Sequence, residues 1–249
     1  MKLKEKTFMK TQSYLTLIVF LISSSLSQAQ NLNKFYQDSD AFLKKWVVNG
    51  NINYAKLNKN FEEIDGLQKQ IADVNLSNAS DDQKKSFYIN AYNLLVINQI
   101  TKYYPLKSPL DKSGFFDKFK HKVAGESITL DYIEKKYLIL KYQDPRIHFA
   151  VSCAAVSCPP LANFAYVPEK LDDQLNERTK FALNLDFVLD IEQSKKQVKV
   201  SKIFDWYIRD FGNSKEGIIK FINKHTSDNI SKDFEVVFLE YDWSVNAIN

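Results

Sequence analysis

The chain has 249 residues and a formal net charge of +4, with 34 Lys and Arg against 30 Asp and Glu. Its high hydrophobic and aromatic content indicates a packed core and excludes a repeat array, a linker or a disordered tail. Six scattered glycines cannot assemble a Gly-rich phosphate-binding loop, so nucleotide chemistry of the usual kinds is not expected.

Residues 1–29 have the three parts of a cleavable signal peptide. Four lysines and a single Glu give a positive start, an apolar stretch runs from Leu15 to Leu26, and Ser27 and Ala29 are small residues before the cleavage point. The apolar stretch is short for a bilayer, which makes an uncleaved anchor the less favoured alternative. We expect an exported protein, in the periplasm or outside the cell, with no stable membrane span after cleavage.

The leader carries most of the positive charge. Without it the chain has 30 basic and 29 acidic residues, a net charge near +1. A nucleic-acid groove needs a basic patch as its electrostatic footprint, so no nucleic acid is expected as a partner. The remaining length suits one large domain or two small ones.

Hydrophobic periodicity and capping signals predict the elements of the mature chain. In chain order they are helix 40–48, an extended piece at 52–54, helix 61–73, helix 80–104, a loop over 105–127, helix 130–140, a buried strand at 147–152, helix 168–184, a hairpin of 187–191 and 197–201, helices 203–210 and 215–224, and a strand at 234–239. Ser80 and Gln83 form a capping-box pattern. We predict a single α+β (mixed α/β) domain over 30–249, helix-rich with a small sheet, for which a papain-like arrangement is one option.

One short segment concentrates the residues that can carry chemistry. His148, Cys153 and Cys158 fall within eleven residues, and an imidazole can draw off a thiol proton to leave a reactive thiolate. On a strand, His148 and Cys153 would point to opposite faces and lie roughly 17 Å apart. They meet only if the chain turns sharply at Ser152 and Cys153. A helix starting there would lower the pKa of the thiol through its dipole.

The two cysteines allow three states, namely a structural disulfide, a catalytic free thiol or two inert buried thiols. Export favours oxidation, and closing a loop of about six residues contributes roughly 2 kcal/mol at most. A reversible Cys153–Cys158 pair would instead indicate redox chemistry. A zinc site needs more ligands than His148 and the two thiols supply, and His121 or His225 would have to approach from afar. No metal or other cofactor is expected.

Glu134 is the most informative carboxylate. On helix 130–140 it falls about 40° from Leu130, inside the apolar sector. A carboxylate on a buried face needs a partner. Two alternatives stand, an ion pair with Arg146 or a contact that orients His148 as the third member of a triad.

Polar residues on two other segments have a structural and a functional interpretation. Asn90 and Asn93 are neighbours on one helix face, where they could donate to a substrate or bond to the backbone of a nearby loop. Asp242, Trp243 and Asn246 near the C-terminus suit either a docking tail or part of a pocket.

Several blocks, in order from about residue 36 to the end, resemble the domain of unknown function 547 family. The blocks are Asn51–Tyr54, Phe87–Asn93, Leu130–Glu134, Arg146–Cys153, Ser157–Pro160, Ile203–Tyr207 and Tyr241–Asn246. The resemblance implies that the His and Cys segment and the Asn-Ala-Tyr-Asn helix are family features, here His148, Cys153, Cys158, Asn90 and Asn93. Bacterial members are often exported, which agrees with the leader. Ser152 stands where the family pattern leads us to expect Asn.

We predict a Cys–His hydrolase or acyl transferase acting on an amide or peptide-like substrate. Cys153 is the expected nucleophile, with Cys158 as its substitute, His148 the base, Glu134 its orienting partner and Asn90 a polar stabiliser. The alternative is a non-catalytic envelope ligand-binding domain with a structural Cys153–Cys158 disulfide. In either case the expected partner is a small-molecule or peptide-like ligand.

Overall fold

In a computed structural model, which describes residues 30–248, one long helix lies at the centre of the fold. Helix α4 (Asp81–Tyr103) is buried on every side over residues 85–101, as expected of a helix covered by neighbours all round. Its N-terminus carries the predicted capping box, in which Ser80 and Gln83 bond reciprocally. The predicted signal peptide, residues 1–29, lies outside the described residues.

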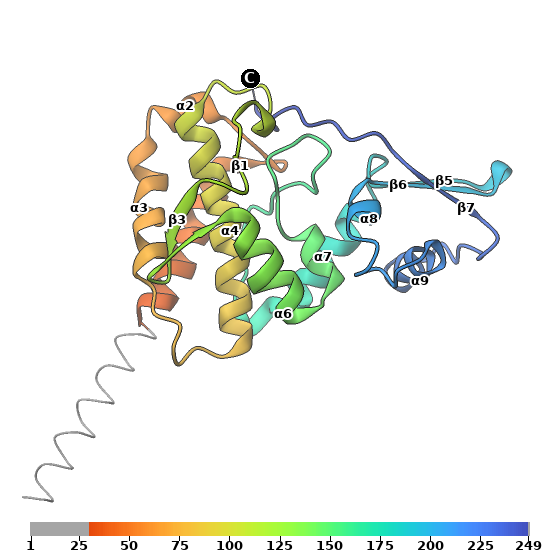
Figure 1. The fold of residues 1–249 in the computed structure, drawn as a ribbon, viewed down its shortest axis with the longest axis horizontal. Coiled ribbons are helices and arrows are strands. Elements are labelled where there is room, and N and C mark those ends of the chain that lie inside the picture. Colours follow the sequence, from red (N-terminus) through yellow and green to blue (C-terminus); the bar gives the residue numbers. More distant parts are fainter. Residues whose placement is uncertain (1–29, 249) are drawn as a thin grey trace, which may run out of the picture.

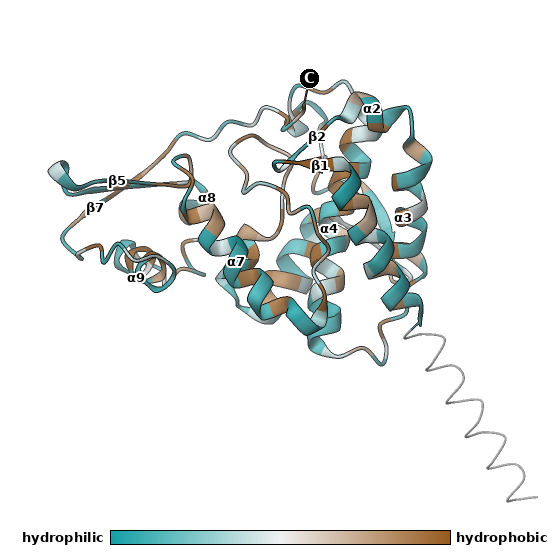
Figure 2. Ribbon diagram, turned by 180° about the vertical axis from the view of Figure 1, so that it is seen from behind, coloured by the Kyte–Doolittle hydropathy of each residue, from teal (hydrophilic) through white to brown (hydrophobic). Residues whose placement is uncertain are grey.

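Helices and two small hairpins pack around α4 at one end of the molecule (Figure 1). They are the helix over residues 30–46, β1 (Val47–Val48), β2 (Asn51–Ile52), α2 (Tyr54–Asn58), α3 (Phe61–Asp73), the 3-10 turn η1 (Pro109–Asp111), β3 (Lys120–Val123) and β4 (Glu126–Thr129). Both hairpins are antiparallel. Hydrophilic residues follow much of the outer helix α3 (Figure 2), whose apolar side chains Ile64, Leu67 and Ile71 are buried.

A three-stranded sheet and the last helices form the other end of the molecule (Figure 1). They comprise β5 (Leu189–Glu192), the 3-10 turn η5 (Gln193–Lys195), β6 (Gln197–Val200), α8 (Ile203–Trp206), α9 (Lys215–His225) and β7 (Glu235–Phe238). Between the two ends lie the 3-10 turn η4 (Pro168–Lys170), which contacts α4, and α7 (Leu171–Leu183), which contacts α9. Strand β6 pairs antiparallel with β5 and parallel with β7. A second hydrophobic cluster, which includes Phe149, Phe204 and Phe211, fills this end.

The helix predicted at 130–140 is continuous from residue 130 to 142 but changes its hydrogen bonding midway. It consists of α5 (Leu130–Tyr132), a π-helical stretch η2 (Ile133–Ile139) and α6 (Leu140–Tyr142). Thr129 caps its start, as predicted. Stretches of π-helix are rare and frequently occur at functional sites, and this one carries Glu134.

The predicted fold class is confirmed: the described residues form a single helix-rich α+β fold with small sheets. The strand predicted at 147–152 is wrong. Asp144 caps a 3-10 turn η3 (Pro145–Phe149), for which Pro145 is preorganised, and irregular chain follows it. The segment 105–127 is not all loop, because it contains η1 and β3. None of the helices within residues 30–248 combines the length and apolar character needed to cross a membrane.

Two asparagines of α4 fasten irregular chain to the central helix. The Asn93 amide donates to the Ala150 carbonyl at 2.9 Å, and its oxygen accepts the Ser152 N–H at 2.8 Å. Asn90 holds both backbone groups of Tyr166 in the same way, at 2.7 and 2.9 Å. Of the two roles considered for these residues, the structure shows the bonds to loop backbone.

Replacing Asn93 by Ala should lower the free energy of unfolding by about 2–4 kcal/mol, because it leaves the buried groups of Ala150 and Ser152 unpaired. Chemical denaturation followed by circular dichroism measures the change. Asn184→Ala is the control, since that exposed side chain bonds only to its own helix at Lys180, and its effect should stay near 0.5 kcal/mol. Equal effects of the two substitutions would contradict the assigned role.

Candidate active site

A cavity of about 270 Å³ lies where α4, the helix over residues 130–142, η3 and α8 meet the C-terminal segment. Its walls are mostly apolar and aromatic, with both thiols, one imidazole and two carboxylates among them. The lining residues are Tyr92, Phe116, Asp131, Glu134, His148, Val151, Cys153, Cys158, Ile203, Trp206, Tyr207, Tyr241 and Trp243. An apolar cavity with a few convergent polar groups is the usual form of a small-molecule site.

The two cysteines are free thiols that lie in direct contact. The Cys153 thiol donates to Cys158 Sγ at a sulfur–sulfur distance of 2.9 Å, and the Cys153 backbone N–H donates to the same sulfur at 2.9 Å. Tyr241 contacts the other sulfur, with its hydroxyl 3.2 Å from Cys153 Sγ. Cys158 is therefore the acceptor of the pair and Cys153 the donor.

This arrangement shifts the pKa values of the two thiols in opposite directions. Burial raises the pKa of Cys158, but hydrogen bonds from the Cys153 thiol and amide outweigh it and hold the pKa below that of an ordinary thiol. Burial and donation to Cys158 both raise the pKa of Cys153. The thiolate is the reactive form of cysteine, so the first sulfur to ionise is Cys158.

The C-terminal segment straps the loop that carries the two cysteines. All three bonds join backbone groups. The Val156 N–H donates to the Ser244 carbonyl at 2.8 Å, the Ser157 N–H to the Asp242 carbonyl at 3.2 Å, and the Asn246 N–H to the Ala154 carbonyl at 3.0 Å. Ala154, between the cysteines, has a left-handed φ of 61°. Such a conformation is costly for a residue with a side chain and persists where its surroundings impose it.

His148 has a different carboxylate partner from the one considered in the sequence. Its Nε2 lies 2.8 Å from Asp210 Oδ2, and its ring packs on Tyr207 with centroids 4.1 Å apart. Asp210 follows α8 and is 62 residues away in sequence. Glu134 therefore does not take the triad position, because Asp210 occupies it.

Glu134 is buried on the inward side of its helix, as predicted, but its partners are phenols. The Tyr207 hydroxyl donates to Glu134 Oε1 at 2.5 Å. Burial, together with the charge and hydrogen bonding of Glu134, raises the pKa of Tyr92 well above the usual value. The same causes raise the pKa of Tyr207. Both phenols thus remain neutral donors to the carboxylate.

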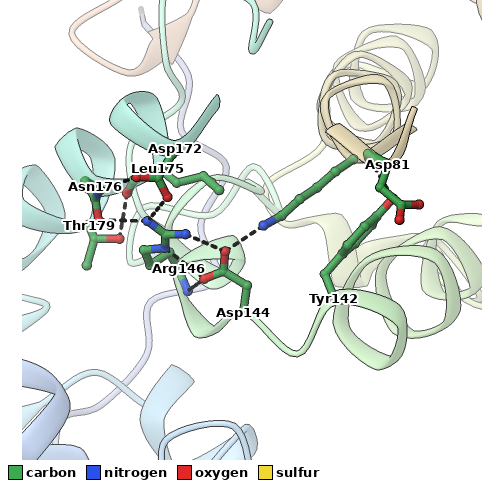
Figure 3. Close-up of polar contacts among 9 residues, drawn as sticks. Asp81, Tyr142, Asp144, Arg146, Asp172, Leu175, Asn176 and Thr179 are labelled. Carbon is green, nitrogen blue, oxygen red and sulfur yellow. Dashed lines mark hydrogen bonds and ion pairs between the residues drawn. The ribbon is translucent and has the colours of Figure 1, made fainter. Parts of the chain in front are cut away.

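The predicted Glu134–Arg146 ion pair is wrong. Figure 3 shows Arg146 between Asp144 and the α7 residues Asp172 and Asn176, to which it is bonded at 2.7–2.9 Å. Lys85 adds a second cation on Asp144 at 2.6 Å. Burial raises the pKa of Asp144, but the two cations outweigh it and hold that pKa well below the usual range. This network anchors the turn η3, on which His148 lies.

The structure brings four of the five predicted site residues to one cavity, Cys153, Cys158, His148 and Glu134. Asn90 does not line it, because both polar atoms of its amide bond to the backbone of Tyr166. The helix start expected after Cys153 is absent as well, since the chain from 151 to 167 is irregular. Donors from Cys153, not a helix dipole, lower the pKa of Cys158.

Sequence reasoning missed most of the cavity wall. Tyr92, Trp206, Tyr207 and Tyr241 line the cavity, and Asp210 forms a hydrogen bond with the ring of His148. Tyr92 lies in the Asn-Ala-Tyr-Asn block, Trp206 and Tyr207 in the block 203–207, and Tyr241 in the block 241–246. Their membership in these blocks was the available signal, but nothing in the spacing assigned them to one site.

The geometry defines a helix-rich α+β protein with two contacting thiols in an aromatic cavity. Residues 76–181 match the model of a family described as protein of unknown function, DUF547. The match supports the resemblance read from the sequence over these residues. The match includes Glu134, His148 and both cysteines, but it ends before Asp210 and Tyr241.

No curated protein and no solved structure matches the chain, so the papain-like arrangement stays a prediction. Within residues 30–248, no group of three or more His, Cys, Asp or Glu side chains is placed to hold a metal ion. His121 lies instead beside Gln99 at 2.9 Å, and His225 packs on Phe221.

Removing the thiol of Cys153 should raise the pKa of Cys158. In the Cys153→Ala variant, the pH at which Cys158 is alkylated at half its maximal rate should rise by about 1–2 units, because a hydrogen bond to a charged group is lost. Iodoacetamide labelling across pH, located by mass spectrometry, measures the midpoint. Cys153→Ser keeps a donor and should shift it less. A midpoint unchanged in both variants would contradict the donor role of Cys153.

Proposed function

We propose that this cavity is the active site of a thiol-dependent enzyme in which Cys158 is the nucleophile. The observation that carries the proposal is the position of Cys158 Sγ, which accepts the thiol and the amide of Cys153 while lining an apolar cavity. A buried thiol that packs as an inert apolar group has no need of two donors, whereas a thiolate does. Export to an oxidising compartment, as predicted from residues 1–29, forms part of this proposal.

Thiol–disulfide exchange is the reaction that this geometry favours. The Cys158 thiolate attacks one sulfur of a substrate disulfide, forms a mixed disulfide and expels the other substrate sulfur as a thiolate. Cys153 then loses its proton to solvent and attacks Cys158 Sγ. The Cys153–Cys158 disulfide forms and the second substrate thiol leaves. The substrate is thereby reduced by two electrons and the protein oxidised by two.

Acyl transfer is a second candidate, because His148 and its partner Asp210 border the same cavity. There Cys158 would attack the carbonyl of an amide or peptide-like substrate, and His148 would take the thiol proton of Cys158 and pass it to the departing amine. Water would then hydrolyse the thioester. The non-catalytic alternative, a ligand-binding domain closed by a structural disulfide, differs from both because its thiols do not turn over.

Trapping distinguishes the exchange reaction. With oxidised glutathione, Cys153→Ser should accumulate a mixed disulfide on Cys158, because the second thiol that would release it is missing. Cys158→Ser should form the adduct at least tenfold more slowly. Mass spectrometry of the intact protein and of its peptides follows both variants. Equal adduct formation at the two positions would remove the support for Cys158 as the nucleophile.

A chromogenic ester tests the second candidate with the same variants. If the site transfers acyl groups, Cys158→Ser should abolish ester cleavage and His148→Ala should slow it at least tenfold. Tyr103→Phe changes a residue that does not line the cavity, so it is the control and should retain the wild-type rate. Cleavage that is independent of both Cys158 and His148 would exclude acyl transfer at this site.

A further inference from the structure

We propose that the cavity selects substrates that carry a positive charge, an ammonium or guanidinium group, beside the group that reacts with Cys158. This inference rests on the proposed thiol chemistry and adds the class of substrate to it. It starts from the two carboxylates in the cavity wall, those of Asp131 and Glu134. Among residues 30–248, no Lys or Arg lines the cavity.

The two carboxylates differ in how their charge is balanced. Asp131 is paired with Lys135, whose amino group lies 2.5 Å away on the exposed face of the helix. Glu134 has no cationic side chain within ion-pair distance among residues 30–248, and its partners are the neutral hydroxyls of Tyr92 and Tyr207. Its residue is only 8% exposed. Buried carboxylates are normally paired with a positive charge, and here Glu134 lines the cavity without one.

An aromatic cluster borders the same cavity. The rings of Trp206, Tyr241 and Trp243 contact one another with centroids 4.8–5.7 Å apart. Trp206 is 47% exposed, an unusual degree for so large an apolar side chain. The face of Trp or Tyr attracts a cation, and such rings recognise organic cations when several surround one site.

Together these groups favour one sign of ligand charge. A cation beside Cys158 gains the uncompensated carboxylate of Glu134 and the faces of Trp206, Tyr241 and Trp243, whereas an anion meets repulsion from all of them. The sulfurs Cys153 and Cys158 lie in the same wall. A disulfide substrate that carries an amino group next to its sulfur, or a peptide with a Lys or Arg side chain, therefore fits the cavity.

Three small disulfides of different charge test the inference. Cystamine is a dication, bis(2-hydroxyethyl) disulfide is neutral and dithiodiglycolate is a dianion. All proteins in this test carry Cys153→Ser, so that the mixed disulfide on Cys158 accumulates. Each rate of adduct formation on Cys158 is divided by the rate of the same reagent with free glutathione, which removes the intrinsic reactivity of the reagent. We expect the corrected rate of cystamine to exceed that of the neutral reagent at least tenfold, and that of the dianion to be the lowest.

Substitution of Glu134 by Gln should bring the ratio of the cystamine rate to the neutral rate down toward one. Glu216→Gln removes an exposed carboxylate at the start of α9 and should leave the ratio unchanged. If Glu134→Gln does not fold, added salt tests the protein that retains Glu134, because screening should lower the ratio even though a buried charge is screened less than an exposed one.

The outcomes separate the inference from the proposed function. Corrected rates that are equal for the three reagents, or a cystamine preference that survives both Glu134→Gln and salt, would overturn the charge selection while leaving Cys158 as the nucleophile. Failure of all three reagents to react with Cys158 would overturn the thiol chemistry itself, and with it the inference.

Discussion

The sulfur of Cys158 is the atom on which this account depends. In an apolar cavity, burial alone keeps a thiol protonated and inert. Here the amide and the thiol of Cys153 both donate to Cys158 Sγ, and they reverse the effect of burial on its pKa. The interaction also fixes the roles of the two cysteines, because the group that donates is held as a thiol while the acceptor ionises.

The rest of the fold holds these two residues in contact. Asn93, on the central helix α4, fixes the backbone on the N-terminal side of Cys153, and the C-terminal segment bonds to residues 154–157 between the cysteines. The η3 turn, anchored by Arg146 and Asp144, carries His148 to the same cavity. Segments far apart in sequence are thus needed to form one short loop, which explains the left-handed Ala154 within it.

Local signals predicted much of the fold. The capping box at Ser80, the periodicity of α3 and α4 and the hairpin of β5 and β6 depend on neighbouring residues, and all were confirmed. The strand predicted at 147–152 was wrong because an apolar run of this length has no fixed conformation by itself. The cap at Asp144 and the bonds to Asn93 decide its shape.

The sequence predicted most of the reactive residues of the site but not the residues with which they interact. Chemistry singled out Cys153, Cys158, His148 and Glu134, and the structure places all four at one cavity. Their partners Asp210, Tyr207 and Tyr241 are 62 to 88 residues distant in sequence, so only the tertiary fold could assign them. The inward position of Glu134 followed from helical periodicity, whereas the choice of Tyr207 over Arg146 as its partner did not.

Equilibration of the folded protein in glutathione redox buffers tests the central claim most directly. The fraction of Cys153–Cys158 disulfide, measured by acid quenching and mass spectrometry, should change reversibly with the ratio of reduced to oxidised glutathione. Far-ultraviolet circular dichroism should stay unchanged, because the sulfurs are already in contact. Thiols that remain reduced even in fully oxidised glutathione, or a disulfide that forms only as the protein unfolds, would contradict the account.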